Sequence, residues 1–224
     1  MAHQQKIFIL IPAFNEATAV KSVIRACKAE GFPNILIVDD GSSDGTGEAA
    51  REEGVTVVQH AINRGKGAAV KTGFEACKLL QADIVVTLDA DGQHDASDIK
   101  NMLKPIQEGY DITLGQRTFK LGVMPLAKIA ANHIANIFTF LLSGLSIHDS
   151  QCGFRAYSRT ALKKLETTAD NFALESEIIR SIREQNLRFA EVPIRTIYTS
   201  YSTKKKNAQN FWNGLKTLYG LISK

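Results

Sequence analysis

The first half of the chain alternates short apolar runs with longer amphipathic stretches. Apolar runs of strand length cover 6–11, 34–38, 55–59, 84–88 and 111–115, and the first is expected to stop at Pro12. Helix-compatible stretches cover 15–30, 47–53, 68–80 and 97–108. Strands that alternate with helices over short connections form parallel sheets with right-handed crossovers. The pattern therefore predicts an α/β fold, with a Rossmann-like, mostly parallel sheet and helices on both faces.

The regular alternation stops after Arg117. Beyond it, the pattern predicts a mostly helical stretch at 121–145, a short strand at 154–158, a helix at 174–185 and a strand pair or bent strand at 189–197. We expect a single domain over residues 1–198, with 6–117 as its regular half and 118–198 as a second, mixed half. Lys128, His133 and two asparagines interrupt the apolar stretch 121–147, so we do not expect it to span a membrane.

The last part of the sequence, 199–224, combines a basic segment with an amphipathic pattern. Ser, Thr and Lys dominate 199–207, which we expect to be mobile. From 209 onward, aromatic and aliphatic residues recur at spacings of one, three or four, which predicts a helix with one broad apolar face. Such a helix either lies on an anionic membrane, helped by the nearby lysines, or docks on its own domain or a partner subunit.

Carboxylates follow two of the predicted strands. Asp89 and Asp91 come directly after the run 84–88, and Asp39 and Asp40 come after 34–38. The carboxyl ends of parallel strands form the ligand-binding edge of an open α/β sheet, so both pairs are expected there. Two carboxylates two residues apart repel unless a cation lies between them, and Gln93 adds a neutral oxygen donor. The pattern favours Mg²⁺ or Mn²⁺ shared with substrate phosphates, although Asp-x-Asp-Gly is also a common turn.

Composition and missing motifs exclude several classes of function. The net charge of +4, from 27 basic and 23 acidic residues, is too small for a protein that coats nucleic acid. Three widely spaced cysteines without a metal-type pairing favour a reducing compartment, with the cytoplasm as the default. No Gly-x-Gly-x-x-Gly follows the first strand and no Gly-Lys-Ser/Thr loop occurs, which argues against dinucleotide oxidoreductases and P-loop enzymes.

Four motifs follow one another along the chain. They are IPAFNE at 11–16, VDDGSSDGT at 38–46, DADGQH at 89–94 and GFRAYS at 153–158. In this order they resemble the motifs of the family 2 glycosyltransferases of GT-A fold, and most closely those of the polyprenyl-phosphate and dolichyl-phosphate mannosyl or glucosyl transferases. The resemblance spans about 6–198. It implies that 6–117 binds a nucleotide sugar and that 118–198 forms the acceptor side.

The resemblance also implies roles for individual residues. The nucleotide-sugar site would contain Pro12, Ala13, Asn15, Glu16, Asp39, Asp40, Lys66 and Asp89, with Asp39 and Asp40 at the base and ribose. The metal would be held by Asp89, Asp91 and Gln93, and the acceptor phosphate would be bound by Arg117, Arg155 and Ser150. Asp91, Arg117 and Arg155 would be the catalytic residues. Lys66 also lies in a Gly-flanked loop before a predicted helix, a place that attracts phosphate but is equally typical of a solvated turn.

The reaction implied is transfer of a hexose, with inversion, from a GDP- or UDP-linked sugar to a polyprenyl (dolichyl-type) phosphate, assisted by Mg²⁺ or Mn²⁺. A phosphate monoester is largely a dianion at neutral pH, because its second pKa is about 6, and it needs no general base. A hydroxyl acceptor would need one. Because a long-chain polyprenyl phosphate is available only at a membrane, we expect a cytoplasmic protein that can bind the cytoplasmic membrane face peripherally.

Three other functions stay open. The same fold could transfer a sugar to a carbohydrate or protein hydroxyl, with Glu175 or Glu177 as the base. A nucleotidyltransferase would share the Rossmann-like core, although no Gly-rich nucleotide loop follows the first strand. A non-enzymatic membrane-binding module would use the predicted helix at 209–224, although the complete set of motifs argues against it.

Overall fold

The computed structural model describes residues 5–117, 134, 136, 137, 139–141, 143–165 and 174–197. The basic segment predicted at 199–207 and the amphipathic helix predicted at 209–224 lie outside these residues, as does most of the helix predicted at 121–145. The residues described between 134 and 141, and residue 143, are helical. Within the described ranges, no helix has both the length and the apolar character needed to cross a bilayer.

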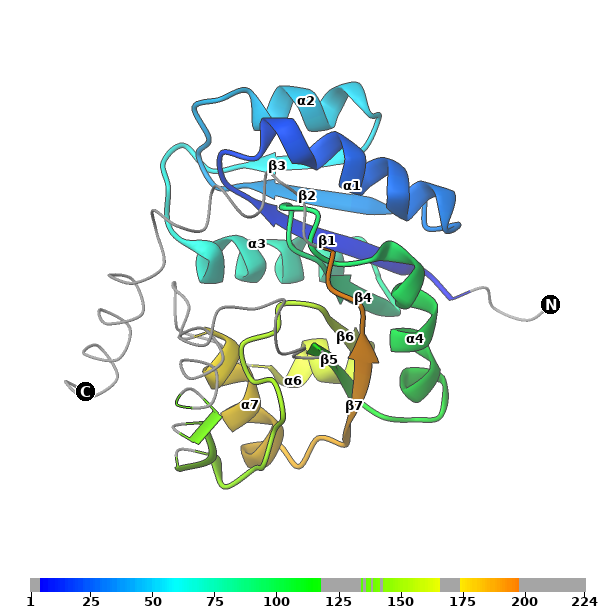
Figure 1. Ribbon diagram of the computed structural model, residues 1–224, viewed down its shortest axis with the longest axis vertical. Helices are drawn as coiled ribbons and strands as arrows, with labels where there is room; N and C mark the ends of the chain where they lie inside the picture. The colour runs from blue at the N-terminus through cyan, green and yellow to red at the C-terminus, as the bar shows by residue number, and fades with distance from the viewer. Residues whose placement is uncertain are drawn as a thin grey trace.

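The first half folds as the alternation predicts (Figure 1). Its elements are β1 (Ile7–Ala13), α1 (Ala17–Ala29), β2 (Ile35–Asp39), α2 (Thr46–Glu52), β3 (Thr56–Gln59), α3 (Lys66–Leu79), β4 (Ile84–Thr87), the 3-10 turn η1 (Ala96–Asp98), α4 (Ile99–Gln107) and β5 (Ile112–Arg117). The strand and helix boundaries lie within one or two residues of the predicted ones. The predicted α/β class is therefore confirmed.

The second half contains β6 (Arg155–Ser158), α6 (Arg159–Lys164), α7 (Leu174–Glu184) and β7 (Phe189–Ile194). The short helix α6 was not predicted. It begins where the Ser158 hydroxyl accepts a hydrogen bond from the Ala161 amide, an N-cap that directly follows a strand. The residues 189–197 do not form a strand pair: β7 is one strand, and Thr196 makes an isolated bridge with His94.

The seven strands form one sheet in the order β3-β2-β1-β4-β6-β5-β7. The pairs β1–β2, β1–β4, β2–β3 and β5–β7 are parallel, whereas β6 is antiparallel to both of its neighbours, β4 and β5. The sheet is thus mostly parallel, with one reversed strand of the second half, β6, inserted between β4 and β5 of the first half. This is the mixed second half that the sequence predicts.

Each face of the sheet is covered by its own helices because alternate strand residues point to opposite faces. One core joins Ile9, Ile11, Ile35, Ile37 and Val86 to residues of α1, α2 and α4. The other joins Phe8, Leu10, Leu36, Val38 and Val85 to residues of α3, α6 and α7. Strands buried on both faces explain the continuous apolar runs seen in the sequence.

Pro12 does not end the first strand, which continues to Ala13. The expectation was wrong because a proline interrupts a strand only where its missing N–H is needed by a neighbour. The register of β1 with β4 ends at Leu10 paired with Thr87, whereas the pairing with β2 continues through Pro12 and Val38. Pro12 therefore lies beyond the last residue pair on the β4 side, at the edge where the loops begin.

Candidate active site

Both halves of the domain contribute to one edge of the sheet. The carboxyl ends of the parallel strands lie there, at Ala13, Asp39, Thr87 and Arg117. Since β6 runs in the opposite direction, it is the amino end of this strand, Arg155 paired with Thr87, that reaches the same edge. The chain also changes direction here, because β2 and β3 lie on one side of β1 and β4 on the other. Open α/β sheets bind their ligands at such a switch point.

Asp39, the last residue of β2, is fully buried. Its Oδ1 accepts a hydrogen bond from the Ser42 amide at 3.0 Å, and its Oδ2 has no hydrogen-bond partner among the described residues. Gly47 leaves room at that oxygen, because a Cβ there would lie 2.7 Å from Asp39 Oδ2. A buried carboxylate oxygen without a donor is costly, so this oxygen fits the predicted contact to a nucleobase.

Asp40 is buried as well, but its oxygens are bonded within the protein. Oδ1 accepts from the Arg64 amide at 2.9 Å and faces His60 Nδ1 at 2.7 Å, and Oδ2 accepts from the Gly65 amide at 2.7 Å. The Asp40 amide donates to the Ala13 carbonyl at 2.8 Å. A contact between Asp40 and a base or ribose stays a prediction, and it would require one of these bonds to be exchanged.

The loops after β1 and β2 are joined by side-chain to main-chain hydrogen bonds. The Asn15 amide donates to Ser42 Oγ at 2.9 Å, and the Glu16 amide donates to Thr46 Oγ1 at 2.8 Å. Asn15 has a φ of 52°, which asparagine tolerates better than most residues. These bonds bring the predicted nucleotide residues Asn15 and Glu16 beside the loop that begins at Asp39. Their contacts to a nucleotide, like those of Pro12 and Ala13, stay predictions.

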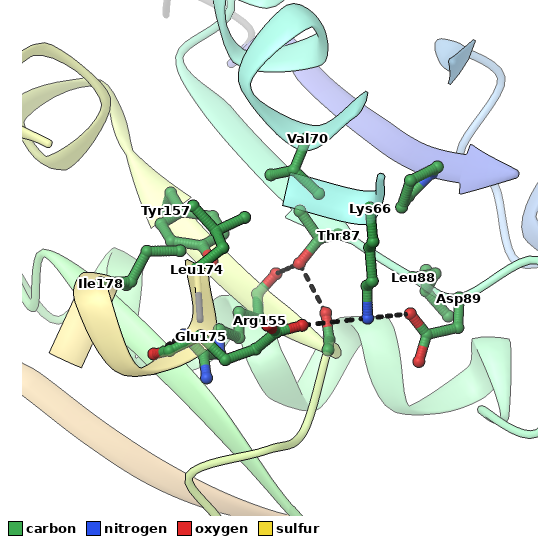
Figure 2. A pocket seen from close by; sticks show the side chains of 12 residues that line it. Lys66, Val70, Thr87, Leu88, Asp89, Arg155, Tyr157, Leu174, Glu175 and Ile178 are labelled. Atoms are coloured by element: carbon green, nitrogen blue, oxygen red, sulfur yellow. Dashed lines mark hydrogen bonds and ion pairs between the residues drawn. The ribbon is translucent and has the colours of Figure 1, made fainter. Parts of the chain in front are cut away.

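Lys66 joins the two halves of the site (Figure 2). Its Nζ lies 2.7 Å from Asp89 Oδ1 and 3.1 Å from Glu175 Oε1, between a loop that follows β4 and the first turn of α7. Burial alone would lower the pKa of Lys66, but the two carboxylates outweigh it and raise the pKa above its usual value. Burial likewise opposes ionisation of Asp89, yet Lys66 and His94 hold the pKa of Asp89 well below its usual value. Of the trio Lys66, Asp89 and Glu175, the first two are therefore both ionised at neutral pH.

A small cavity of about 20 Å³ adjoins this trio, enough for about one water molecule. Pro12, Lys66, Thr87 and Gly153 are among its lining residues. The Thr87 hydroxyl donates to the Gly153 carbonyl at 2.7 Å, which fixes the loop before β6 against the end of β4 (Figure 2). A Cβ at Gly153 would lie 2.7 Å from Asp89 Oδ1 and 2.8 Å from Lys66 Nζ, so only glycine fits here without moving the ion pair.

Asp91 and Gln93, two of the three predicted metal ligands, are held together. The Gln93 amide donates to Asp91 Oδ1 at 3.0 Å, and the Gln93 side-chain amide donates to Asp91 Oδ2. The third, Asp89, is engaged by Lys66. No group of three His, Cys, Asp or Glu side chains suited to a metal occurs among the described residues. A single oriented carboxylate still fits Mg²⁺ or Mn²⁺, because such ions take one or two carboxylates plus substrate phosphates and water.

The burial and the contacts of His94 could not be predicted from its position in the sequence. It is 8% exposed, its Nε2 lies 3.2 Å from Asp89 Oδ2, and its ring packs against Phe154 with the centroids 5.3 Å apart. Its pairing with Thr196 ties the segment after β7 to the loop after β4. These contacts give His94 a structural role, in which it orients Asp89.

Arg155 is 2% exposed and bonded to three main-chain carbonyls. Its guanidinium donates to Cys152 O at 2.9 Å, to Ser150 O at 2.7 Å and to Glu175 O at 3.2 Å. It thereby joins the loop before β6 to the first turn of α7. The predicted contact between Arg155 and an acceptor phosphate stays a prediction, and it would require the guanidinium to leave these carbonyls.

Arg117, at the end of β5, forms a bidentate pair with Asp149. Nε lies 2.7 Å from Oδ2 and Nη2 lies 2.8 Å from Oδ1, and the Arg117 amide donates to the same carboxylate at 3.1 Å. Burial would lower the pKa of Arg117, but Asp149 outweighs it and raises the pKa. Ser150 is fully buried, and its amide and hydroxyl both donate to Asn136 Oδ1 at 3.0 and 2.7 Å. Acceptor contacts of Arg117 and Ser150 stay predictions.

The model of the glycosyl transferase family 2 matches residues 8–166, well over half of the sequence. The chain belongs to this family. The resemblance seen in the four motifs is thus confirmed, and the matched range covers the sheet edge from β1 to the loop before β6.

Curated relatives of this family 2 glycosyltransferase match along nearly its whole length. An uncharacterized protein of Methanocaldococcus jannaschii is 41% identical over 98% of this chain and 92% of its own. The UDP-N-acetylglucosamine–dolichyl-phosphate N-acetylglucosaminyltransferase of Methanococcus voltae is 36% identical over 96% of this chain and 94% of its own. The polyprenol monophosphomannose synthase of Mycolicibacterium smegmatis is 28% identical over 92% of this chain and 83% of its own.

Solved structures confirm the fold of this glycosyltransferase. A glucosyl-3-phosphoglycerate synthase from Mycobacterium tuberculosis, in complex with Mn²⁺, uridine diphosphate and glucosyl-3-phosphoglycerate, superposes with a TM-score of 0.76. The match covers 98% of this chain and 79% of that chain at 20% identity. At this identity the likeness shows the α/β GT-A fold and nothing more.

Several residues at the candidate site of this glycosyltransferase were not predicted. They are Asp149, Asn136 and His60, none of which lies in one of the four motifs. Each binds a residue 14 to 32 positions away in the sequence: Arg117, Ser150 and Asp40, respectively. A single sequence offers no signal for such pairs. Glu175 was proposed as a base in one alternative, and its bond to Lys66 could not be foreseen from its position in a helical turn.

Proposed function

We propose that this glycosyltransferase moves a hexose, with inversion, from a nucleotide diphosphate sugar to a polyprenyl phosphate, and that it uses Mg²⁺ or Mn²⁺. The observation that carries the proposal is the match to curated relatives that cover nearly the whole chain and whose names specify dolichyl phosphate or polyprenol phosphate chemistry. A product analysis with UDP- and GDP-linked sugars decides which nucleotide the donor carries.

The donor would lie at the edge formed by β1, β2 and β4. Asp39 Oδ2, buried and without a donor among the described residues, suits a base N–H. Lys66, the cation between Asp89 and Glu175, suits a diphosphate, because exchange of one carboxylate for a phosphate oxygen keeps its charge neutralised. Asp91 would hold the metal, which when bound supplies Lewis-acid stabilisation of the departing diphosphate.

In the proposed reaction, the bond between sugar C1 and the diphosphate oxygen breaks and its electron pair leaves with the nucleoside diphosphate. An oxygen of the acceptor phosphate forms the new bond to C1 from the opposite face. At neutral pH this phosphate is already largely a dianion, because its second pKa is about 6, so no residue has to remove a proton. Arg117, at the carboxyl end of β5, would contribute positive charge to the recognition of the acceptor phosphate.

An exposed apolar stripe supports peripheral contact with a membrane. Ile134, Ile137, Phe140 and Leu141 are helical, and their exposed fractions range from 50% to 71%. Asn136, in the same helical segment, binds Ser150, so this stripe is connected to the loop before β6. Apolar residues exposed in this number mark a surface that meets lipid or protein.

Product analysis tests the proposed function. UDP-glucose, UDP-N-acetylglucosamine and GDP-mannose are each offered with Mg²⁺ or Mn²⁺ to polyprenyl phosphate in detergent, to the matching polyprenol without phosphate, and to a simple sugar. We expect one donor to give a glycosylated polyprenyl phosphate and free nucleoside diphosphate, and the polyprenol to give nothing. Transfer to polyprenol or to the sugar but not to polyprenyl phosphate, or release of pyrophosphate, would overturn the proposal.

A second candidate, transfer to a hydroxyl acceptor, is favoured by one observation. Glu175 is 5% exposed, and its Oε2 has no hydrogen-bond partner within the described part of the chain. A carboxylate so placed beside Lys66 could serve as the general base that a hydroxyl requires. The contact with Lys66 argues for a different role, because Lys66 Nζ already engages Glu175 Oε1 at 3.1 Å.

Glu175→Gln separates the two candidates. With a phosphate acceptor we expect the variant to keep at least about a tenth of wild-type kcat, since only one hydrogen-bond partner of Lys66 changes. Loss of a general base would instead cost about 10²- to 10⁴-fold. Glu177→Gln, at the other candidate base in the same turn, is measured beside it. A loss of a hundredfold or more in one of the two variants would favour the hydroxyl acceptor.

A further inference from the structure

A buried histidine connects β3, β2 and α3 behind the donor edge. His60 is 9% exposed, its Nδ1 lies 2.7 Å from Asp40 Oδ1, and its Nε2 lies 2.9 Å from Thr72 Oγ1. Its amide donates to the Asp39 carbonyl at 2.9 Å. Because an ionised carboxylate only accepts hydrogen bonds, Nδ1 must carry the proton in this contact. His60 therefore binds Asp40 as a donor and α3 through Thr72.

Asp40 in turn fixes the start of α3. It accepts the amides of Arg64 and Gly65, at 2.9 and 2.7 Å, and Gly65 is the residue before the first turn of the helix, with a φ of 96°. No side chain of the helix caps its own N-terminus. The carboxylate of Asp40 thus satisfies amides that would otherwise lack a partner, and its negative charge is favourable at a helix N-terminus.

The next residue is Lys66, whose Nζ meets Asp89 and Glu175. We propose that His60 is a positioning residue for donor transfer: by holding Asp40 it sets the loop at 63–65, and the loop sets the place of Lys66 at the crevice. The contacts follow one another without a gap, from His60 to Asp40, to the Arg64 and Gly65 amides, and to Lys66. The inference rests on the proposed function only in taking Lys66 as a contact of the donor diphosphate.

The loop depends on His60 because the buried carboxylate of Asp40 needs all of its hydrogen-bond donors. Its carboxylate is 2% exposed, and removal of the His60 donor leaves a buried charge with the two loop amides alone. Such a carboxylate recovers hydrogen bonds by moving toward water and takes the loop with it. A helix start displaced by even about 1 Å is enough to weaken a catalytic contact strongly.

His60→Leu tests the inference, with His60→Asn and Thr72→Val as matched controls. The asparagine amide can donate to Asp40 from nearly the position of Nδ1, and Thr72→Val leaves the bond between His60 and Asp40 in place. We expect His60→Leu to lower kcat/KM for the donor about tenfold, the size of one lost hydrogen bond to a charged group. Both controls should stay within about threefold of wild type, and the KM for the acceptor should not change in any of them.

A double-mutant cycle with Lys66→Met shows whether His60 acts through the lysine. If it does, His60→Leu has no further effect on donor kcat/KM in the Lys66→Met background, whereas two independent effects would multiply. Multiplying effects would overturn the inference. Wild-type donor kinetics in His60→Leu would overturn it too, and so would an equal loss for donor and acceptor that matches a smaller folded fraction by circular dichroism.

The donor in these experiments is the one that the wild-type protein uses in the product analysis, and its slow hydrolysis without acceptor is a second readout. If wild type hydrolyses the donor but does not transfer to polyprenyl phosphate, the proposed acceptor is wrong while the inference on His60 can still be decided. If the wild-type protein transfers the sugar to polyprenyl phosphate and His60→Leu has the same donor kinetics, the proposed function holds and only the inference on His60 is wrong.

Discussion

Asp91→Asn is expected to abolish metal-dependent turnover while the domain stays folded. Asp91 follows β4 at the donor edge, and Gln93 orients its carboxylate with two hydrogen bonds. The substitution keeps the size of the side chain but removes the charge that would bind Mg²⁺ or Mn²⁺. Since a metal contributes several kcal/mol to the stabilisation of a leaving group, its loss should lower kcat about 1,000-fold.

The measurement is donor turnover against metal concentration, with the melting temperature recorded for each protein. Asp95→Asn is the matched control, because Asp95 lies in the same loop but accepts hydrogen bonds from Ser97 and pairs with Arg195. We expect this control to melt at a lower temperature and to keep its metal dependence. Wild-type activity in Asp91→Asn, or undiminished wild-type activity in excess chelator, would contradict a metal at Asp91.

The fold could be predicted to the extent that it follows from local pattern. From β1 to β5, strands and helices alternate regularly along the chain. Helices cover both faces of the sheet, so its strands are continuous apolar runs that can be recognised in the sequence. The place of β6 could not be predicted. It is a four-residue strand whose direction depends on pairing with β4 and β5, far away in the sequence, and such pairing has no local signal.

The candidate site divides in the same way. Asp39 and Asp91 are recognisable because one ends a buried strand and the other follows one closely, and their position fits a ligand edge in the structure. The same reasoning placed Asp40 at this edge, and the family resemblance singled out Arg155, but neither could reveal the contacts of these residues. Most of their partners are main-chain groups, which any residue type can supply and which meet only in the folded domain.

The second large effect concerns stability: Arg155→Lys is expected to lower the melting temperature by about 10 °C. The guanidinium is 2% exposed and binds the carbonyls of Ser150, Cys152 and Glu175. A lysine ammonium cannot reach three carbonyls spread over a planar fork, so at least one buried carbonyl loses its donor. The expected loss is about 2–4 kcal/mol, and each kcal/mol corresponds to about 2–4 °C for a domain of this size.

Arg159→Lys is the matched control for this change. Arg159 also donates to two carbonyls, those of Ala82 and Gln81, but its side chain is 48% exposed, so water can replace the lost bonds and the melting temperature should stay within about 2 °C. The kinetics decide the role of Arg155. Because it anchors the acceptor-side loop and the turn that holds Glu175 beside Lys66, its loss should raise the KM of both substrates. An unchanged melting temperature with a higher KM for polyprenyl phosphate alone would instead show that Arg155 meets the acceptor phosphate directly, as the sequence motif predicts.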